Sequence, residues 1–166
     1  MSFGKDAQPD FQLSWINTLN FAKDFDFAMV WHTSQGAYNS SLTRELKDEG
    51  GTTFDWTAEV KDLSSPRIFG NPGYSTLNYL FDASYIRLRE VSLYYSIPNI
   101  ANATKNKISN IKIGVSAQNL ITISDYLKNG YDPEASNFGN TPLGANVDLA
   151  PFPSSKRIFG HLILEF

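Results

Sequence analysis

Residues 110–124 read NIKIGVSAQNLITIS, and apolar and polar side chains alternate along almost the whole stretch. The apolar positions are Ile111, Ile113, Val115, Ala117, Ile121 and Ile123. A period of two residues is typical of a β-strand whose two faces meet different surroundings. This stretch therefore predicts an amphipathic strand.

Four more stretches alternate in the same way, and they predict strands at 11–21, 25–35, 84–97 and 157–166. In the third of these, Ile86 and Leu88 occupy even positions, whereas Val91 and Leu93 occupy odd ones. This slip near Arg89-Glu90 predicts a β-bulge, which would restore the apolar residues to one face. Strands of this length exceed the ~5–6 residues usual in soluble domains. They match the ~9–11 residues with which a tilted strand crosses a bilayer.

The connections between these strands alternate between short and long. Residues 22–24 predict a tight turn and 98–108 a short link, whereas 36–82 and 125–155 predict long loops. An up-and-down membrane barrel has short turns on its periplasmic side and long loops outside the cell. The predicted fold class is therefore all-β, an antiparallel up-and-down transmembrane β-barrel segment with two long extracellular loops. Five strands are too few to close such a barrel, since ~8 is the usual minimum, so other strands are expected to complete it.

Composition excludes several classes of protein. The chain has 166 residues, a formal charge of −3 and a pI near 5.3, so it offers no basic stripe for nucleic acid. It contains no cysteine, which excludes disulfides and thiolate metal sites. The first ten residues, MSFGKDAQPD, lack the basic start and apolar core of a signal peptide, so either the chain is cytosolic or its true beginning is expected upstream of Met1. Nothing in the sequence indicates a cofactor.

The end of the chain carries an apolar ladder, formed by Ile158, Leu162, Leu164 and Phe166. In a barrel, such an aromatic-terminated strand pairs with the first strand and is recognised during outer-membrane assembly. The alternative is an ordinary amphipathic edge strand that ends in phenylalanine. The five strands, and the alternation of short and long connections between them, favour the barrel.

Aromatic residues form a second candidate feature. Girdles at the membrane interfaces are predicted to contain Trp15, Trp31, Tyr85, Tyr94 and Tyr95, although each is equally compatible with a core position. Trp56, in the first long loop, is a candidate for stacking on a sugar or contacting a partner. The alternative, which is commoner for a loop tryptophan, is that it anchors its own loop.

Two further patterns contain residue types that occur in chemical sites. Residues 131–134 (YDPE) bring two carboxylates together, but they lack the ligand number and glycine of a calcium loop, so a proline-containing turn is predicted. His32 and His161 are the only histidines, and neither has a companion at metal-ligand spacing, so both are predicted to be polar-face residues. No phosphate loop or catalytic triad pattern is present, and no enzymatic activity is expected.

Several ordered motifs resemble one family. Residues 82–98 (DASYIRLREVSLYYSIP), 115–122 (VSAQNLIT) and 130–134 (GYDPE) resemble segments near the end of SusC/RagA-type TonB-linked outer-membrane proteins. Counterparts to Pro9–Phe11, Ser34–Gly36 and the run from Pro153 to Phe166 occur in the same order. The motif positions are Ala83, Ser84, Tyr85, Arg87, Leu88, Gln118, Asn119, Gly130, Tyr131, Asp132, Pro133 and Glu134. One departure is Tyr94, which stands where many members have glycine.

The resemblance implies that residues 1–166 are the C-terminal portion of a 22-stranded barrel in the bacterial outer membrane. It implies an N-terminal plug, which these residues do not contain, and energy supplied by the TonB complex through segments that are also missing here. The implied partners are the remaining strands of the barrel, outer-membrane lipid and a SusD-like surface lipoprotein that acts as a lid. The implied function is import of glycans or peptides.

Two other functions remain open from the sequence. The chain could belong to a SusC-like barrel that acts as a structural subunit of another outer-membrane assembly. It could also be a soluble carbohydrate-binding β-sandwich, which would explain the aromatic residues but neither the sorted loops nor the ordered motifs.

Overall fold

The computed structural model describes residues 5–53, 76–105, 107–137, 147–152 and 154–166. The chain divides into two compact units. One comprises Met1–Phe11, Ser34–Tyr85 and Ser124–Ser154, and is called the loop unit here. The other comprises Gln12–Thr33, Ile86–Ile123 and Ser155–Phe166, and is called the sheet unit.

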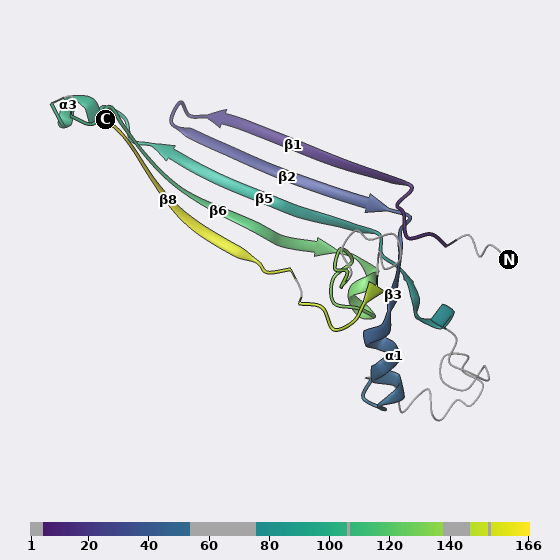
Figure 1. Cartoon of the computed structure of the whole chain (residues 1–166). Helices are drawn as coiled ribbons and strands as arrows, with labels where there is room; N and C mark the ends of the chain where they lie inside the picture. Colours follow the sequence, from purple (N-terminus) through teal and green to yellow (C-terminus); the bar gives the residue numbers. More distant parts are fainter. Residues whose placement is uncertain (1–4, 54–75, 106, 138–146, 153) are drawn as a thin grey trace. The chain divides into compact units, whose positions relative to one another are not determined.

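A single five-stranded sheet runs through the sheet unit. Its strands are hydrogen-bonded in the order β1 (Phe11–Phe21), β2 (Phe25–Gln35), β5 (Tyr85–Ser96), β6 (Asn110–Ile123) and β8 (Arg157–Glu165). These neighbours follow one another along the chain and run back and forth (Figure 1). The predicted all-β, antiparallel class is therefore confirmed, and the strands begin and end within one residue of the predicted ranges. Among the described residues, no helix is both long and apolar enough to span a membrane.

Short connections join the strands at one end of the sheet. Between β1 and β2, Ala22 and Lys23 adopt positive φ values of 50° and 65°, which reverses the chain within three residues. The Asp24 carbonyl then accepts the Ser96 N–H at 2.8 Å, which ties this turn to the end of β5. Between β5 and β6, the short helix α3 (Ile100–Ala103) occupies part of the predicted link.

A bulge interrupts the β5–β6 ladder at the predicted place. Its extra residue is on β6, whereas the sequence predicted it on β5. Leu88 pairs with Ile121 and Glu90 with Gln118, so β5 has one residue in the interval and β6 has two. Within that interval Asn119 has a φ of 54°, a left-handed conformation that asparagine tolerates. Since β5 keeps its regular alternation, the expectation that its apolar residues return to one face is wrong.

That bulge divides the apolar residues of both strands between two faces. Opposite partners share a face, so Leu88 and Ile121 lie on the side of Gln118, whereas Leu93 and Val115 lie on the other. The regular two-faced part of the sheet is therefore the part on the α3 side of the bulge.

The loop unit contains secondary structure that alternation did not predict. A three-stranded sheet has the order β4 (Leu80–Asp82), β3 (Tyr38–Ser41) and β7 (Val147–Asp148), with β3 antiparallel to β4 and parallel to β7. The helices are α1 (Leu42–Glu49) and the 3₁₀ turns η1 (Thr76–Tyr79) and η2 (Asp125–Lys128). The interpretation of 36–82 and 125–155 as plain loops is thus corrected. Elements of two to eight residues are too short to produce a recognisable period.

Local signals define where α1 begins. The Ser41 hydroxyl caps the helix by accepting the Arg44 N–H at 3.3 Å, and Glu45 lies in the first turn. Lys47 lies in the last turn, so both charges complement the helix dipole. Between these short elements, Tyr79 and Tyr126 are fully buried and form part of the core of the loop unit.

Candidate functional site

The sheet unit presents one face of polar side chains that bond to one another. The Ser14 hydroxyl and His32 Nδ1 are 2.9 Å apart, and the Ser116 hydroxyl and His161 Nε2 are 2.7 Å apart. Both histidines are thus hydrogen-bonded to a serine on a neighbouring strand, as fits their interpretation as polar-face residues. Strand alternation places these four side chains on the same side of the sheet.

An ion pair crosses this polar face. The Lys112 ammonium donates to Asp26 Oδ2 at 2.7 Å, although β5 lies between their strands. Asp26 also accepts a hydrogen bond from the amide of Asn20 on β1. Side chains of three strands, β1, β2 and β6, therefore form one network that spans β5.

The opposite face is apolar and uncovered. Leu13 is 62% exposed, Val115 48% and Leu162 66%. A β-sandwich buries its apolar face against a second sheet, and exposure of this extent argues against the carbohydrate-binding sandwich. A face of this kind is stable in lipid, where apolar side chains need no cover.

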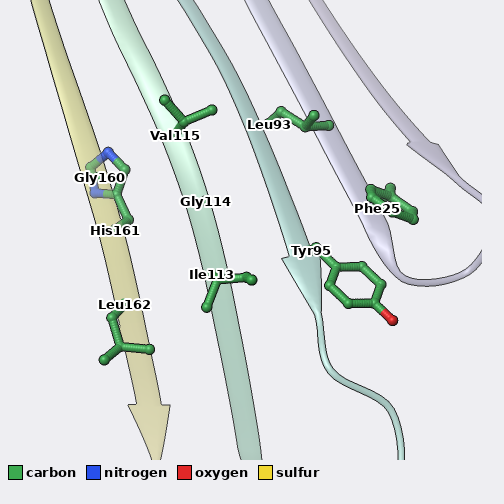
Figure 2. A pocket seen from close by; sticks show the side chains of 9 residues that line it. All are labelled: Phe25, Leu93, Tyr95, Ile113, Gly114, Val115, Gly160, His161 and Leu162. Atoms are coloured by element: carbon green, nitrogen blue, oxygen red, sulfur yellow. The ribbon is translucent and has the colours of Figure 1, made fainter.

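Side chains from four strands line a shallow hollow on this apolar face. Figure 2 shows the side chains of Leu93, Tyr95 and Val115 among those that line it, and a Cβ at Gly160 would meet no atom within 4 Å. The hollow is lined by Phe25, Leu93, Tyr95, Ile113, Gly114, Val115, Gly160, His161 and Leu162.

The predicted girdle residues separate into different environments. Tyr95 packs on Phe25 with ring centroids 4.7 Å apart, beside the β1–β2 turn. Tyr94 lies on the polar face, 5.3 Å from His161 between ring centroids. Tyr85 is buried, and its hydroxyl donates to Glu134. Trp15 is 55% exposed on the apolar face of β1, where a girdle residue is expected.

In the loop unit, Ser84 joins three chain segments. Its hydroxyl accepts the Gly36 N–H at 3.0 Å, and its carbonyl accepts the Ser124 hydroxyl at 2.7 Å. Its own N–H donates to Asp82 Oδ1 at 2.7 Å, and the adjacent Ala83 N–H donates to the Ala37 carbonyl at 2.8 Å. The Ala83-Ser84 motif therefore connects the beginning and end of the first long loop to the start of the second.

The Asp132-Pro133-Glu134 motif closes a turn. Asp132 Oδ1 accepts the Glu134 N–H at 3.0 Å, and Oδ2 accepts the N–H of Ser154 at 3.2 Å and its hydroxyl. The Pro133 carbonyl accepts the Asn39 amide at 2.9 Å. These bonds occupy the Asp132 carboxylate with protein donors, which supports the turn interpretation over a calcium loop.

Sequence reasoning missed Asp148, a buried carboxylate in the loop unit. It is fully buried and accepts hydrogen bonds from the Tyr126 hydroxyl at 2.9 Å, the Tyr131 N–H at 3.4 Å and the Thr43 hydroxyl. Burial and the neighbouring Asp148 carboxylate raise the pKa of Tyr126. Gly130 is required beside them, because a Cβ there would overlap the Tyr126 ring and lie 2.6 Å from Asp148 Oδ2.

The remaining predicted residues are placed as follows. Arg87 and Leu88 are buried, Gln118 pairs with Glu90 next to the bulge, and Asn119 lies within it. In the apolar ladder, Ile158, Leu162 and Leu164 lie on the edge strand β8 and Phe166 directly follows it, and all four are exposed. Its role in barrel closure stays a prediction. Trp56 lies outside the described residues.

Comparison with known proteins shows a consistent likeness. No family model matches the chain. It is 29% identical to TonB-dependent receptor P3 of Formosa agariphila over 97% of its own length, and 30% identical to receptor P26 of the same organism over 82%. It spans only 17% and 14% of these two relatives.

Solved structures with the same fold include those of the RagAB peptide importer. The open-open state matches with a TM-score of 0.75 and 24% identity, and the closed-closed state with 0.68 and 25%. Each match covers 98% of this chain and 18% of the solved chain. The fold and the sequence thus point to the same class of outer-membrane barrel.

Proposed function

The chain is a SusC/RagA-like segment of a TonB-dependent outer-membrane β-barrel, and we propose that it forms part of the wall and outer loops of an importer for peptides or glycans. In this proposal the transporter works with a SusD-like surface lipoprotein. The observation that supports this proposal is the single sheet, which has one uncovered apolar face and one face of polar side chains that are hydrogen-bonded to one another. The apolar face would contact lipid, and the polar face would line the lumen.

In this proposal the loop unit forms the outer loops of the importer. Ser84, Asp132 and Asp148 hold its segments together through buried or partly buried hydrogen bonds, which gives a folded cap instead of free loops. Loops fixed in this way can present a defined surface to cargo or to a lid protein. This placement outside the cell follows from the strand directions expected of an outer-membrane barrel.

The proposed function is tested in the organism that produces the chain. A strain lacking the gene should lose growth on either a peptide mixture or a glycan as carbon source, and a strain lacking TonB should show the same loss. Retained growth on both substrates, together with a defect in outer-membrane assembly, would instead favour a structural barrel subunit.

A second measurement tests the proposal that this chain is one part of a larger barrel. An antibody against residues 125–155 should detect a band much larger than 18.6 kDa in outer membranes. A band near 18.6 kDa would contradict this proposal and would require a separate chain that supplies the other strands.

A further inference from the structure

A pocket of about 410 Å³ lies within the loop unit. One side is formed by α1 and the residues after it, and the other by η2 and the turn that follows. Its lining residues are Thr43, Arg44, Lys47, Thr52, Thr53, Leu127, Lys128, Asn129, Gly130 and Tyr131. This volume is at the lower end of the ~300–1,000 Å³ of small-molecule sites, so it suits one residue or sugar ring of a longer cargo.

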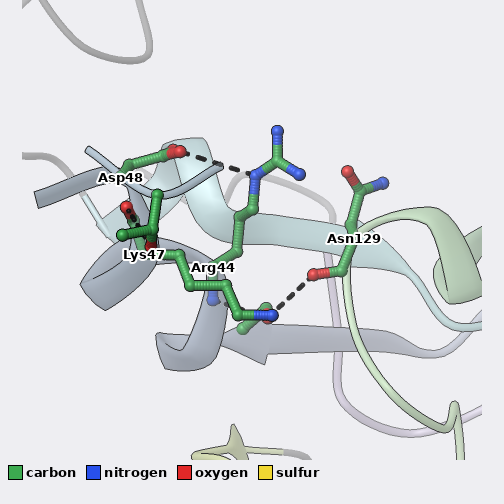
Figure 3. A network of polar contacts seen from close by, with 6 residues as sticks. Arg44, Lys47, Asp48 and Asn129 are labelled. Atoms are coloured by element: carbon green, nitrogen blue, oxygen red, sulfur yellow. Dashed lines mark hydrogen bonds and ion pairs between the residues drawn. The ribbon is translucent and has the colours of Figure 1, made fainter. Parts of the chain in front are cut away.

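The lining contains three cations and no carboxylate. Arg44 Nε lies 3.6 Å from Asp48 Oδ1 (Figure 3), and Lys128 Nζ lies 2.6 Å from Asp125 Oδ1, so an aspartate beside the pocket balances each of these charges. Lys47 has no carboxylate partner in the part of the chain that the structure describes. Its Nζ lies 4.9 Å from the ring centroid of Tyr131. The positive charge of Lys47 is therefore available to a ligand.

The two glutamates of α1 do not cancel this charge. Glu45 and Glu49 are on the same helix, but neither lines the pocket. The pKa of Glu45 is raised by burial and by the repulsion of Glu49. The pocket itself keeps a cationic lining.

Thr53 supplies an independent sign of a ligand. It lines the pocket and is only 8% exposed, yet its buried hydroxyl oxygen has no hydrogen-bond partner among the described residues. A buried hydroxyl without a partner is unfavourable, and such groups in native proteins generally require an explanation. A ligand oxygen in the pocket would accept a hydrogen bond from this hydroxyl.

We propose that this pocket binds a carboxylate group of an acidic cargo molecule. Lys47 supplies the opposite charge, Thr53 donates a hydrogen bond, and the exposed faces of Tyr131 and Leu127 contact the apolar part of the bound residue or sugar. The inference rests on the proposed importer function, because it assigns a cargo class to that transporter. A glutamate-rich peptide and an oligouronate share this chemistry.

The test uses the full receptor purified from outer membranes with its partner lipoprotein, and measures Kd by calorimetry. The probes are a short oligoglutamate peptide, an oligogalacturonate, and neutral oligomers of equal length. Lys47→Ala should weaken binding of the acidic probe by about tenfold or more, since it removes a charge-assisted hydrogen bond. Lys107→Ala, which removes an exposed lysine of the sheet unit, is the matched control and should leave Kd unchanged. Binding of the oligoglutamate would identify a peptide as the source of the carboxylate, and binding of the oligogalacturonate would identify a glycan.

Thr53→Val separates binding from folding. Because valine has nearly the same shape, it should weaken acidic binding several-fold while the melting temperature stays equal or rises, since an unpaired buried hydroxyl is removed. A purely structural threonine would leave Kd unchanged. Unchanged Kd in both variants, or no preference for acidic over neutral probes, would overturn the inference. TonB-dependent uptake of a neutral cargo, measured in the same strains, would then show whether the proposed function still stands.

Discussion

Tyr94 lies directly opposite Gly114 in the β5–β6 register, and its ring covers the space that a Cβ at Gly114 would occupy. Such a Cβ would be 2.7 Å from Cε1 of Tyr94 and 2.8 Å from Cγ. An aromatic ring over a glycine on the neighbouring strand shields a backbone that has no side chain of its own. The departure from the family pattern at Tyr94 is therefore accommodated by the glycine across from it.

Gly114→Ala is expected to destabilise the sheet by about 1–2 kcal/mol, because the added methyl group forces the Tyr94 ring away from His161. Denaturant titration of the full receptor in detergent measures this loss. A second change, Tyr94→Ala, should recover part of it by making room. Gly160→Ala is the control and should be neutral, since a Cβ there meets nothing within 4 Å. Equal losses at Gly114 and Gly160 would contradict the packing described.

Tyr126 is expected to make the stability of the loop unit depend on alkaline pH. Its pKa is raised from 10.0 in the folded state, by burial first and by the Asp148 carboxylate second. The folded chain therefore holds this proton more tightly than the unfolded chain, and the stabilisation present below pH 10 is lost as the pH rises above it.

Tyr126→Phe tests this dependence. Below pH 10 the variant should be less stable by about 1 kcal/mol, because the hydrogen bond to Asp148 is lost. The difference from the wild type should shrink above pH 10. Limited proteolysis of the loop unit from pH 8 to 11 measures it, and two parallel curves would show that Tyr126 does not titrate in this way.

Strand positions were predictable because alternation is a local property. In β6, each apolar residue from Ile111 to Ala117 is followed by a polar residue or glycine, and no distant contact is needed to recognise the strand. The bulge was also visible, as a change of parity in β5. The strand that carries its extra residue was not predictable, because whether that residue lies near Arg89 in β5 or at Asn119 in β6 depends on how the two strands pair.

The centre of the loop unit was not predictable for a related reason. Thr43 and Asp148 are 105 residues apart in the chain, and no local pattern indicates that they meet. The Gly130 and Asp132 motif was recognised by its resemblance, and the structure explains its residues: Gly130 makes room for Tyr126, and Asp132 closes a turn. The pocket beside Lys47 carried no signal in the sequence.

The bulge requires a left-handed backbone conformation at position 119, and asparagine is expected to stabilise the bulge because it tolerates this conformation. Its φ of 54° is unfavourable for most side chains, so Asn119→Ala should destabilise the sheet by about 1 kcal/mol, whereas Asn119→Gly should be close to neutral. Gln118→Ala, at the neighbouring position without a positive φ, provides the comparison. Denaturant titration distinguishes them, and an alanine at 119 that is as stable as glycine would show that the bulge forms elsewhere.

Leu162 and His161 are consecutive residues of β8, so strand alternation turns their side chains to opposite sides of the sheet, and the same substitution at each tests which side meets lipid. In a bilayer, an arginine on the lipid face costs about 2–4 kcal/mol near the midplane, whereas lumen positions tolerate charge. Leu162→Arg should therefore reduce the folded, heat-modifiable fraction of receptor reconstituted in phospholipid vesicles. His161→Arg should not, because its side is already lined by Ser116 and other polar groups. An equal loss in both variants would mean that the exposed apolar face is not the face in contact with lipid.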